Sequence, residues 1–502
     1  MSGQNAKYRL LEEQHNPGPS YNWFRLCVLF TICTFSTLAV FTIWNTILNY
    51  RDALNVPPKV LELPPWLSQR IDLYTSYIQK MYSSRAHYDF RNFQTSYLNE
   101  SNMTVKKFDD ETIYLSKWGN FIYPDNLKNK KLVCYYSSPS FLSIDPFDNL
   151  QIRDVDPFLC THINVGLVHV VNDRLNITDD IREIFNETRA LKIRNHDLKI
   201  LVWAGGINSR GFAQMVQNHA RRKTFIQSLK YTLHDYYLDG VDIDWEFPSA
   251  YNKEKQHFSQ LLHEIRREYQ REHRTYILSV AVAAPEGIAY FAYDIRELQN
   301  YCDFVNIMTY DFHFYTKGAP FTGINSPLYA RHKERSILAT LNINYTVNYW
   351  NKNGLNKNKI IIGLPTYGHS YRLVNAFNHE IESPAKGFGL VGRSGFASYP
   401  AVCWFKNNNI YVTTKFDTET CSPYMYAGLE WISFENIESI ECKTKYILDN
   451  NFGGAMVFSL NTDDFSGKYC SKSNFNNKNL SKNSTFPLVR KIRSILFDPI
   501  LP

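Results

Sequence analysis

Three acidic residues recur at every second position of the segment LDGVDIDWEFP, namely Asp242, Asp244 and Glu246. In a β-strand all three side chains would lie on one face, with about 6.6 Å between successive members. Burying them together costs on the order of several kcal/mol, so they must titrate as a coupled set. This favours acid–base chemistry, with an internally hydrogen-bonded acidic cluster as the alternative. Asp239 is out of phase and is expected to hold the strand or its entry turn.

The elements that must position these acids follow from the apolar runs between Lys131 and the C-terminus. Eight runs alternate with charged helical patterns: KLVCYYS, HINVGLVHV, KILVWAGG, GVDIDWEF, YILSVAVAA, FVNIMTYDF, KIIIGLPTY and GGAMVFSLN. This order predicts an α/β protein, a (β/α)8 TIM barrel in which Glu246 lies at the carboxyl end of the fourth strand. A doubly wound open sheet would more typically have a Gly-rich phosphate loop after its first strand, and none is present.

The last two runs are separated by about 85 residues, much more than one helix and its loops. Residues from about 371 to 430 contain Gly, Pro and short β-like runs such as NNIYVTTKF. We expect a small α+β subdomain here, inserted between the seventh and eighth strands. Such a wall would turn the rim of the barrel into a groove for an extended substrate.

Composition narrows the class of partner. The 502 residues are 44% hydrophobic, enough for a large core, and the net charge of +7 is not concentrated in Lys/Arg blocks. Nucleic acid is therefore not an expected partner. No C-x-x-C pair is present, and the fourteen histidines lack metal-ligand spacing, so neither a metal nor another cofactor is expected.

An uncharged apolar run extends over residues 26–48 and would span about 34 Å as a helix. Aromatic residues lie on both sides of it, as at membrane interfaces. We expect a cytoplasmic tail at 1–25, a transmembrane signal anchor at 26–48 and a stalk at 49–128. A buried core helix is the alternative.

The orientation of this span is indicated by the N-x-S/T tripeptides, which are potential glycosylation acceptors. All of them follow the span: Asn99, Asn102, Asn176, Asn186, Asn344, Asn479 and Asn483. The expected protein is therefore single-pass and type II, in contact with the membrane through one N-terminal span. Its barrel, at 129–475, would be lumenal or extracellular and would be followed by a tail at 476–502.

The segment DGVDIDWE matches the D-x-x-D-x-D-x-E signature of the glycoside hydrolase family 18 chitinases and chitinase-like proteins. The resemblance covers about residues 131 to 470. Further segments that resemble the family are LCTHINVG, NHDLKILVWAGG, FVNIMTYDFH, GINSPLY, KIIIGLPTYGHSY and GGAMVFSLNTDDFSG.

The resemblance implies a mechanism in which the N-acetyl carbonyl oxygen of the substrate is the nucleophile. Glu246 matches the general acid, and Asp244 matches the residue that stabilises the oxazolinium cation. Asp242 would be the buried partner of Asp244, and Tyr310 the hydroxyl donor to the acetamido group. Substrate contacts would come from Asp311, Met308, Tyr135, Phe458 and Tyr367. The alternative for Tyr310 and Asp311 is that they only close the sixth strand.

Several lining positions depart from the family pattern while the acids do not. Phe458 stands where the eighth strand usually ends in Trp, His369 replaces an Arg, and Phe247 replaces a Tyr. Leu167, Ile207 and Pro139 occupy positions that are often aromatic. Each lost stacking platform would weaken binding by about 1 to 3 kcal/mol. Two functions are therefore open: a hydrolase of β-1,4 linkages between N-acetylglucosamine units in chitin or chitooligosaccharides, and a catalytically inactive lectin for such glycans.

The cysteines fit an oxidising compartment. By the same resemblance, Cys134 pairs with Cys160 and Cys403 with Cys470. Cys421 and Cys442 are available for a third pair, which the sequence alone does not establish. Cys302 is expected to be a buried free thiol.

Overall fold

The computed structural model describes residues 130–138, 147, 149–206, 209–249, 252–470 and 485–497. The predicted span at 26–48, the tail before it and the stalk after it lie outside these residues. No helix within the described ranges is both long enough and apolar enough to cross a membrane.

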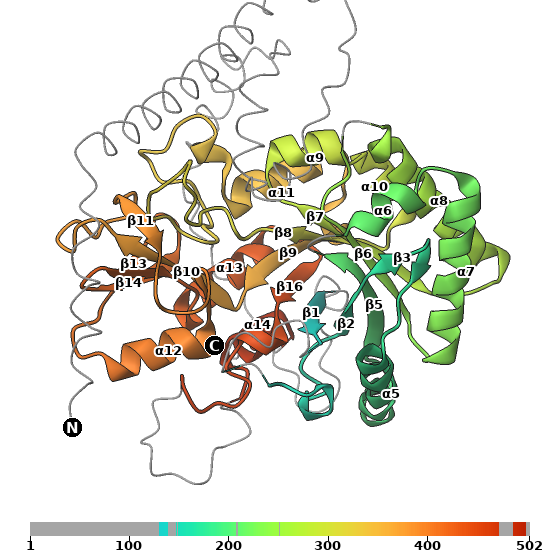
Figure 1. The fold of residues 1–502 in the computed structure, drawn as a ribbon, viewed down its shortest axis with the longest axis horizontal. Coiled ribbons are helices and arrows are strands. Elements are labelled where there is room, and N and C mark those ends of the chain that lie inside the picture. Colours follow the sequence, from blue (N-terminus) through green and yellow to red (C-terminus); the bar gives the residue numbers. More distant parts are fainter. Residues whose placement is uncertain are drawn as a thin grey trace, which may run out of the picture. The chain divides into compact units, whose positions relative to one another are not determined.

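Eight parallel strands close into a barrel in the order β1-β16-β9-β8-β7-β6-β5-β2 (Figure 1). Each of the eight apolar runs supplies one of them, which confirms the predicted (β/α)8 barrel. The strands are β1 (Lys131–Ser137), β2 (His162–Val168), β5 (Lys199–Gly206), β6 (Gly240–Trp245), β7 (Ile277–Ala283), β8 (Phe304–Met308), β9 (Ile360–Pro365) and β16 (Gly454–Phe458).

Helices cover the outside of the barrel because each carries an apolar stripe. In α8, for example, the buried residues are Phe258, Leu261, Leu262, Ile265 and Tyr269, the spacing of one helix face. The barrel helices are α5 (Asp179–Arg194), α6 (Arg210–Met215), α7 (His219–Asp235), α8 (Glu254–Arg271), α9 (Glu286–Ala292), α10 (Ile295–Tyr301), α11 (Ile343–Lys352) and α13 (Ile437–Asp449).

Short elements fill the loops. A two-stranded hairpin joins β3 (Val170–Val171) to β4 (Arg174–Leu175), and four 3-10 turns complete the described connections. These turns are Ile152–Asp154, Leu338–Thr340, Lys357–Lys359 and Leu460–Thr462.

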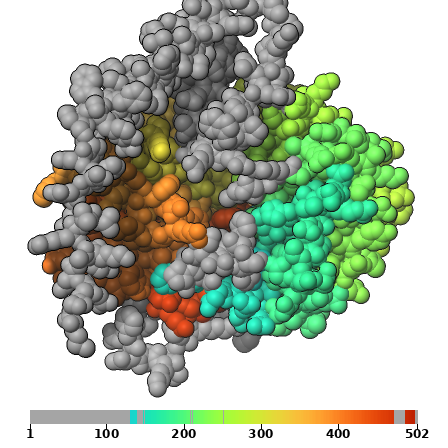
Figure 2. Space-filling model, in the orientation of Figure 1, coloured from blue at the N-terminus to red at the C-terminus, as the bar shows by residue number. Residues whose placement is uncertain are grey.

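The insertion between β9 and β16 forms an antiparallel sheet in the order β11-β10-β15-β14-β13, with β12 paired to β10. Its core contains Trp431, Tyr371 and Tyr424. Figure 2 shows this subdomain in orange beside the teal and green surface of the first barrel units. Its elements are β10 (Tyr367–Leu373), β11 (Ala385–Phe388), β12 (Phe396–Ser398), α12 (Tyr399–Asn408), β13 (Thr413–Asp417), β14 (Ser422–Ala427) and β15 (Glu430–Ser433).

The segment expected to be a C-terminal tail contains a further helix, α14 (Pro487–Phe497), which packs on α13 and β1. Its buried side chains are Leu488, Val489, Ile492, Ile495 and Leu496. The backbone N–H of Val489 also donates to Asp463 Oδ2 at 3.0 Å. This helix therefore belongs to the packed domain.

Disulfides join Cys134 to Cys160 and Cys403 to Cys470, as predicted. The first ties β1 to the segment before β2, and the second ties α12 to the chain after β16. A third bridge joins Cys421 to Cys442, and Cys302 is a buried free thiol.

Candidate active site

The three acids Asp242, Asp244 and Glu246, called the acidic ladder below, begin on β6, where successive side chains point to opposite sides of the strand. Asp242 and Asp244 are buried inside the barrel, with 0% and 2% of their surface exposed. The side chain of Trp245, the next residue, points to the opposite side of the strand and packs on Phe212 and Phe258. Glu246 follows the last residue of β6, at the carboxyl end of the barrel. The structure therefore brings all three acids to one side of this strand.

Asp242 is the most completely hydrogen-bonded of the three. Its carboxylate accepts hydrogen bonds from Tyr135 Oη at 2.5 Å, Ser279 Oγ at 2.6 Å and Asn306 Nδ2 at 2.9 Å. These donors come from β1, β7 and β8, so the barrel interior itself holds the group. Burial raises the pKa of Asp242, and the three hydrogen bonds oppose that rise by favouring the charged form.

Asp244 has one hydrogen-bond donor, the indole Nε1–H of Trp203, which lies 2.9 Å from Oδ2. No described residue donates to the buried Oδ1 of Asp244. Burial and the charge of Asp242 raise the pKa of Asp244 to about 7, and the Trp203 hydrogen bond acts in the opposite direction. Asp244 therefore changes charge near neutral pH and has one oxygen available to a ligand.

Glu246 is the member of the acidic ladder that is best suited to act as a general acid. Burial, the charge of Asp244 and the charge of Asp311 together raise the pKa of Glu246 well above its usual value. A raised pKa keeps a carboxyl group protonated at neutral pH, as a general acid requires. The backbone N–H of Glu246 donates to Ser209 Oγ at 3.1 Å, which ties this residue to the loop after β5.

A second group of polar side chains comes from the loop after β8 and from β10. Asp311 Oδ1 accepts from Tyr367 Oη at 2.6 Å and from His369 Nε2 at 2.7 Å. The Asp311 side chain is 47% exposed, in contrast to the buried acids of β6. Tyr310 is buried, and its hydroxyl lies 3.8 Å from Met456 Sδ.

Aromatic rings surround these polar groups. The ring of Phe458 has its centroid 5.7 Å from Tyr135, 5.8 Å from Trp203 and 5.7 Å from Tyr310. Met308 and Phe458 are partly buried against this cluster. The partly exposed ring of Phe458 can face the apolar side of a sugar while the carboxyl groups contact its polar substituents.

Asp239 stands apart from this group, at the entry of β6. Its Oδ2 accepts from the backbone N–H of Ile200 and from Lys192 Nζ, both at 2.8 Å. It thereby joins the starts of β5 and β6, the structural position that its phase in the sequence predicts.

The structure adds residues that the sequence reasoning did not select. Trp203, Ser279 and Asn306 are the direct partners of the acids, and each lies on a barrel strand. Their sequence signal is inward alternation along the predicted strands. His369, which replaces the Arg of the family pattern, is a partner of Asp311. Ile207 and Pro139 lie outside the described residues.

Among the described residues, no group of three or more His, Cys, Asp or Glu side chains could hold a metal ion.

Comparisons with known proteins agree with this geometry. Residues 131–463 match the model of the family "Glycosyl hydrolases family 18". Chitinase-3-like protein 2 from Homo sapiens is 32% identical over 73% of this chain and 92% of its own length. Chitotriosidase-1 from Mus musculus is 30% identical over 77% of this chain and 81% of its own length.

A solved structure supports the same assignment. Human YKL-39, described as a pseudo-chitinase with retained chitooligosaccharide binding, is 30% identical with a TM-score of 0.66. The match covers 73% of this chain and 99% of that one. With the acidic signature on its fourth barrel strand and the family match along the whole barrel, the chain belongs to glycosyl hydrolases family 18, as a chitinase or chitinase-like protein.

Proposed function

We propose that this protein hydrolyses β-1,4 linkages between N-acetylglucosamine units of chitin or chitooligosaccharides, by a substrate-assisted retaining mechanism. The observations that carry the proposal are the buried position of Glu246 beside Asp244, which raises the pKa of Glu246 well above its usual value, and the Oδ1 of Asp244, to which no described residue donates. A neutral amide would serve a lectin equally well as a hydrogen-bond donor, whereas only a carboxyl group can transfer a proton to the glycosidic oxygen.

In the first step, Glu246 gives its proton to the glycosidic oxygen as the bond from that oxygen to C1 breaks. The N-acetyl carbonyl oxygen forms a new bond to C1, which yields an oxazolinium ion. The free Oδ1 of Asp244 accepts a hydrogen bond from the acetamido N–H, and its charge stabilises the cation. Tyr310 donates its hydroxyl proton to the acetamido oxygen in a hydrogen bond and thereby orients it.

In the second step, the ionised Glu246 takes a proton from water as the water oxygen attacks C1. The bond from C1 to the acetamido oxygen breaks and the acetamido group re-forms, so the configuration at C1 is retained. Hydrogen bonds from Tyr135, Ser279 and Asn306 to Asp242 favour its charged form and so oppose the effect of burial beside Asp244.

A second candidate function is supported by the aromatic lining. The ring that closes the eighth strand is Phe458, which offers less stacking area than Trp and has no N–H donor. The relative described as a pseudo-chitinase shows that this fold can retain chitooligosaccharide binding without being a chitinase. An inactive chitin-type lectin is therefore the competing proposal.

The proposal also includes the N-terminal segment. The uncharged run at 26–48 and the acceptor tripeptides that follow it support a single-pass type II glycoprotein, with the barrel lumenal or extracellular. The full chain should remain with membranes after carbonate washing, and glycosidase treatment should lower its mass. Release of an unmodified soluble protein would contradict both parts.

The test of the enzymatic proposal is turnover of chitotriose and chitotetraose by the full-length protein in detergent. Glu246→Gln, which has nearly the same shape but lacks the acid, is the matched control. Glucose oligomers without the N-acetyl group should not be cleaved, because they lack the nucleophile.

A further inference from the structure

Asn325 lies in the loop between β8 and α11 and is completely buried. It is not part of the acidic ladder. Nevertheless it makes four hydrogen bonds, which reach the loop after β8, β10 and β15. Two of these bonds are made by its side chain and two by its backbone, and together they fix the relative positions of the three elements.

Two of these bonds hold the segment of Asp311. The backbone N–H of Asp311 donates to Asn325 Oδ1 at 2.9 Å, and that of Phe312 donates to the Asn325 carbonyl at 3.0 Å. Asp311 has φ +57°, in the left-handed region that residues other than glycine rarely adopt. Such a conformation persists only when the surroundings enforce it.

The other two bonds reach the inserted subdomain. Asn325 Nδ2 donates to the Tyr367 carbonyl at 3.1 Å, and the Asn325 backbone N–H donates to Ser433 Oγ at 2.8 Å. Tyr367 is also the residue whose hydroxyl donates to the Asp311 carboxylate. Asn325 therefore holds the backbones of both members of the Asp311–Tyr367 pair.

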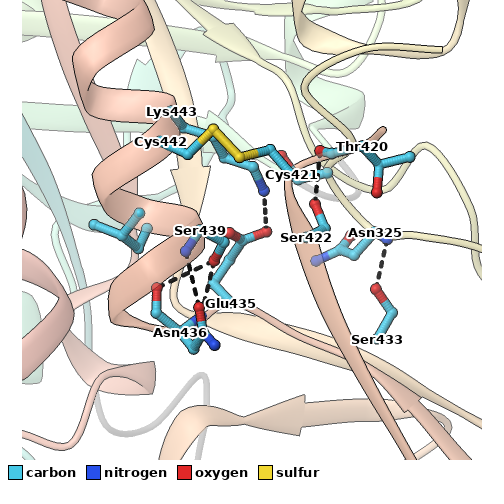
Figure 3. A network of polar contacts seen from close by, with 12 residues as sticks. Asn325, Thr420, Cys421, Ser422, Ser433, Glu435, Asn436, Ser439, Cys442 and Lys443 are labelled. Carbon is cyan, nitrogen blue, oxygen red and sulfur yellow. Dashed lines mark hydrogen bonds and ion pairs between the residues drawn. A yellow bond between two sulfur atoms is a disulfide. The ribbon is translucent and has the colours of Figure 1, made fainter. Parts of the chain in front are cut away.

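The subdomain end of this connection is itself fixed to the barrel. Just beyond Ser433, Glu435 forms a buried ion pair with Lys443 of α13 at 2.5 Å, and both side chains are 1% exposed. The neighbouring Cys421–Cys442 disulfide joins the start of β14 to the same helix. Figure 3 shows the ion pair, the disulfide and the Asn325–Ser433 bond in one view.

We propose that Asn325 is a positioning residue that fixes the Asp311 carboxylate at the barrel mouth, by joining its backbone to Tyr367 and to the inserted subdomain. This inference rests on the proposed hydrolysis, in which Asp311 faces the substrate and Glu246. Asn325 does not touch the reacting atoms. It acts through Asp311 and Tyr367.

Displacement of Asp311 has a measurable electrostatic consequence. Its negative charge contributes to the raised pKa of Glu246, so moving that charge away lowers the pKa at which Glu246 loses its proton. The basic limb of the pH profile then moves to lower pH. The titratable groups around Glu246 are Asp242 and Asp244 on β6, Tyr293 after α9, Tyr310 and Asp311 after β8, and Tyr367 and His369 on β10.

The experiment is a double-mutant cycle with Asn325→Ala and Asp311→Asn in the full chain, read as the pH profile of chitotetraose turnover. Asn325→Ala should lower kcat/KM about tenfold and move the basic limb to lower pH. In the Asp311→Asn background, the same change should have less than about a twofold effect, because the charge that it positions is already absent.

Ser326→Ala is the matched control, since it removes a buried side-chain hydrogen bond of the same loop, from Ser326 Oγ to the Thr309 carbonyl, without contacting Asp311. It should leave the basic limb in place. Independent effects of Asn325→Ala and Asp311→Asn, or an equal shift in Ser326→Ala, would overturn the positioning role. If Asn325→Ala does not fold, Asn325→Ser takes its place in the cycle.

Failure of the hydrolase proposal can be distinguished from failure of the positioning role of Asn325. A wild type that binds chitotetraose without cleaving it would remove the hydrolase proposal alone. The same cycle is then read from dissociation constants, where coupling between Asn325 and Asp311 supports the positioning role and additivity contradicts it.

Discussion

Removal of the indole donor to Asp244 should move the acid limb of the pH profile by a predictable amount. Trp203→Phe keeps an aromatic ring in the barrel but deletes the Nε1–H bond of 2.9 Å to Asp244 Oδ2. A hydrogen bond to a charged group contributes about 1.5 to 3 kcal/mol, and one pKa unit corresponds to about 1.4 kcal/mol. The pKa of Asp244, about 7 in the wild type, should therefore rise by roughly one unit or more.

The direction of this pKa shift follows from the negative charge of ionised Asp244. The bond stabilises ionised Asp244, so its loss favours the protonated form and moves the acid limb of kcat/KM to higher pH. At pH 6, below both values, the rate should fall about tenfold, whereas above the new limb it should approach that of the wild type.

The free energy of unfolding reports on the pKa of Asp244 independently of turnover. Because the pKa of Asp244 is raised on folding, the folded state binds the extra proton, and stability falls as pH rises from about 4 to about 7. In Trp203→Phe this decline should continue about one unit further. Urea unfolding at several pH values measures it.

Trp245→Phe is the matched control, because Trp245 lies on β6 and is buried but packs outward on Phe212 and Phe258. It should lose stability without a shift of the acid limb. If both variants shift the limb equally, or if neither does, the assignment of that limb to Asp244 is refuted.

Three further outcomes are expected. Phe458→Trp should tighten chitotetraose binding by about 1 kcal/mol, as calorimetry would measure, and weaker binding would argue against Phe458 as a stacking floor. Glu435→Ala, which leaves Lys443 buried without its partner, should cost about 3 to 5 kcal/mol in chemical unfolding, whereas a loss below 1 kcal/mol would contradict a buried pair. Glycopeptide mass spectrometry should find sugar on Asn176, which is exposed in a loop, and not on Asn344, which lies within α11 and whose side-chain oxygen accepts a hydrogen bond from Asn348 Nδ2; the opposite pattern would be inconsistent with this difference.

The barrel and its acidic ladder could be predicted because both arise from short-range periodicity. Apolar runs separated by helical patterns identify buried parallel strands, and alternation along β6 places Asp242 and Asp244 on the inner face. The subdomain is predicted from the excess length between the seventh and eighth strands and from the short β-like runs within it. Its sheet begins at Tyr367 and ends at Ser433, slightly beyond the expected 371–430, because β10 follows β9 almost directly.

The contact between Asp311 and His369 has no local signal in the sequence. His369 and Asp311 are 58 positions apart, and only the paths of β8 and β10 bring them together. Helix α14 did carry a signal, since its buried residues recur at helical spacing. The preceding Asn/Lys-rich composition led to the interpretation of the whole segment as a tail.

Comparison of wild type with Glu246→Gln on chitotetraose tests the central claim most directly. Turnover and affinity are measured on the same full-length preparations. If Glu246 is the general acid, the wild type cleaves the substrate, and the variant loses nearly all turnover while its affinity stays within a few-fold. A wild type that binds chitotetraose but cleaves it no faster than Glu246→Gln would contradict the hydrolase proposal and favour the lectin.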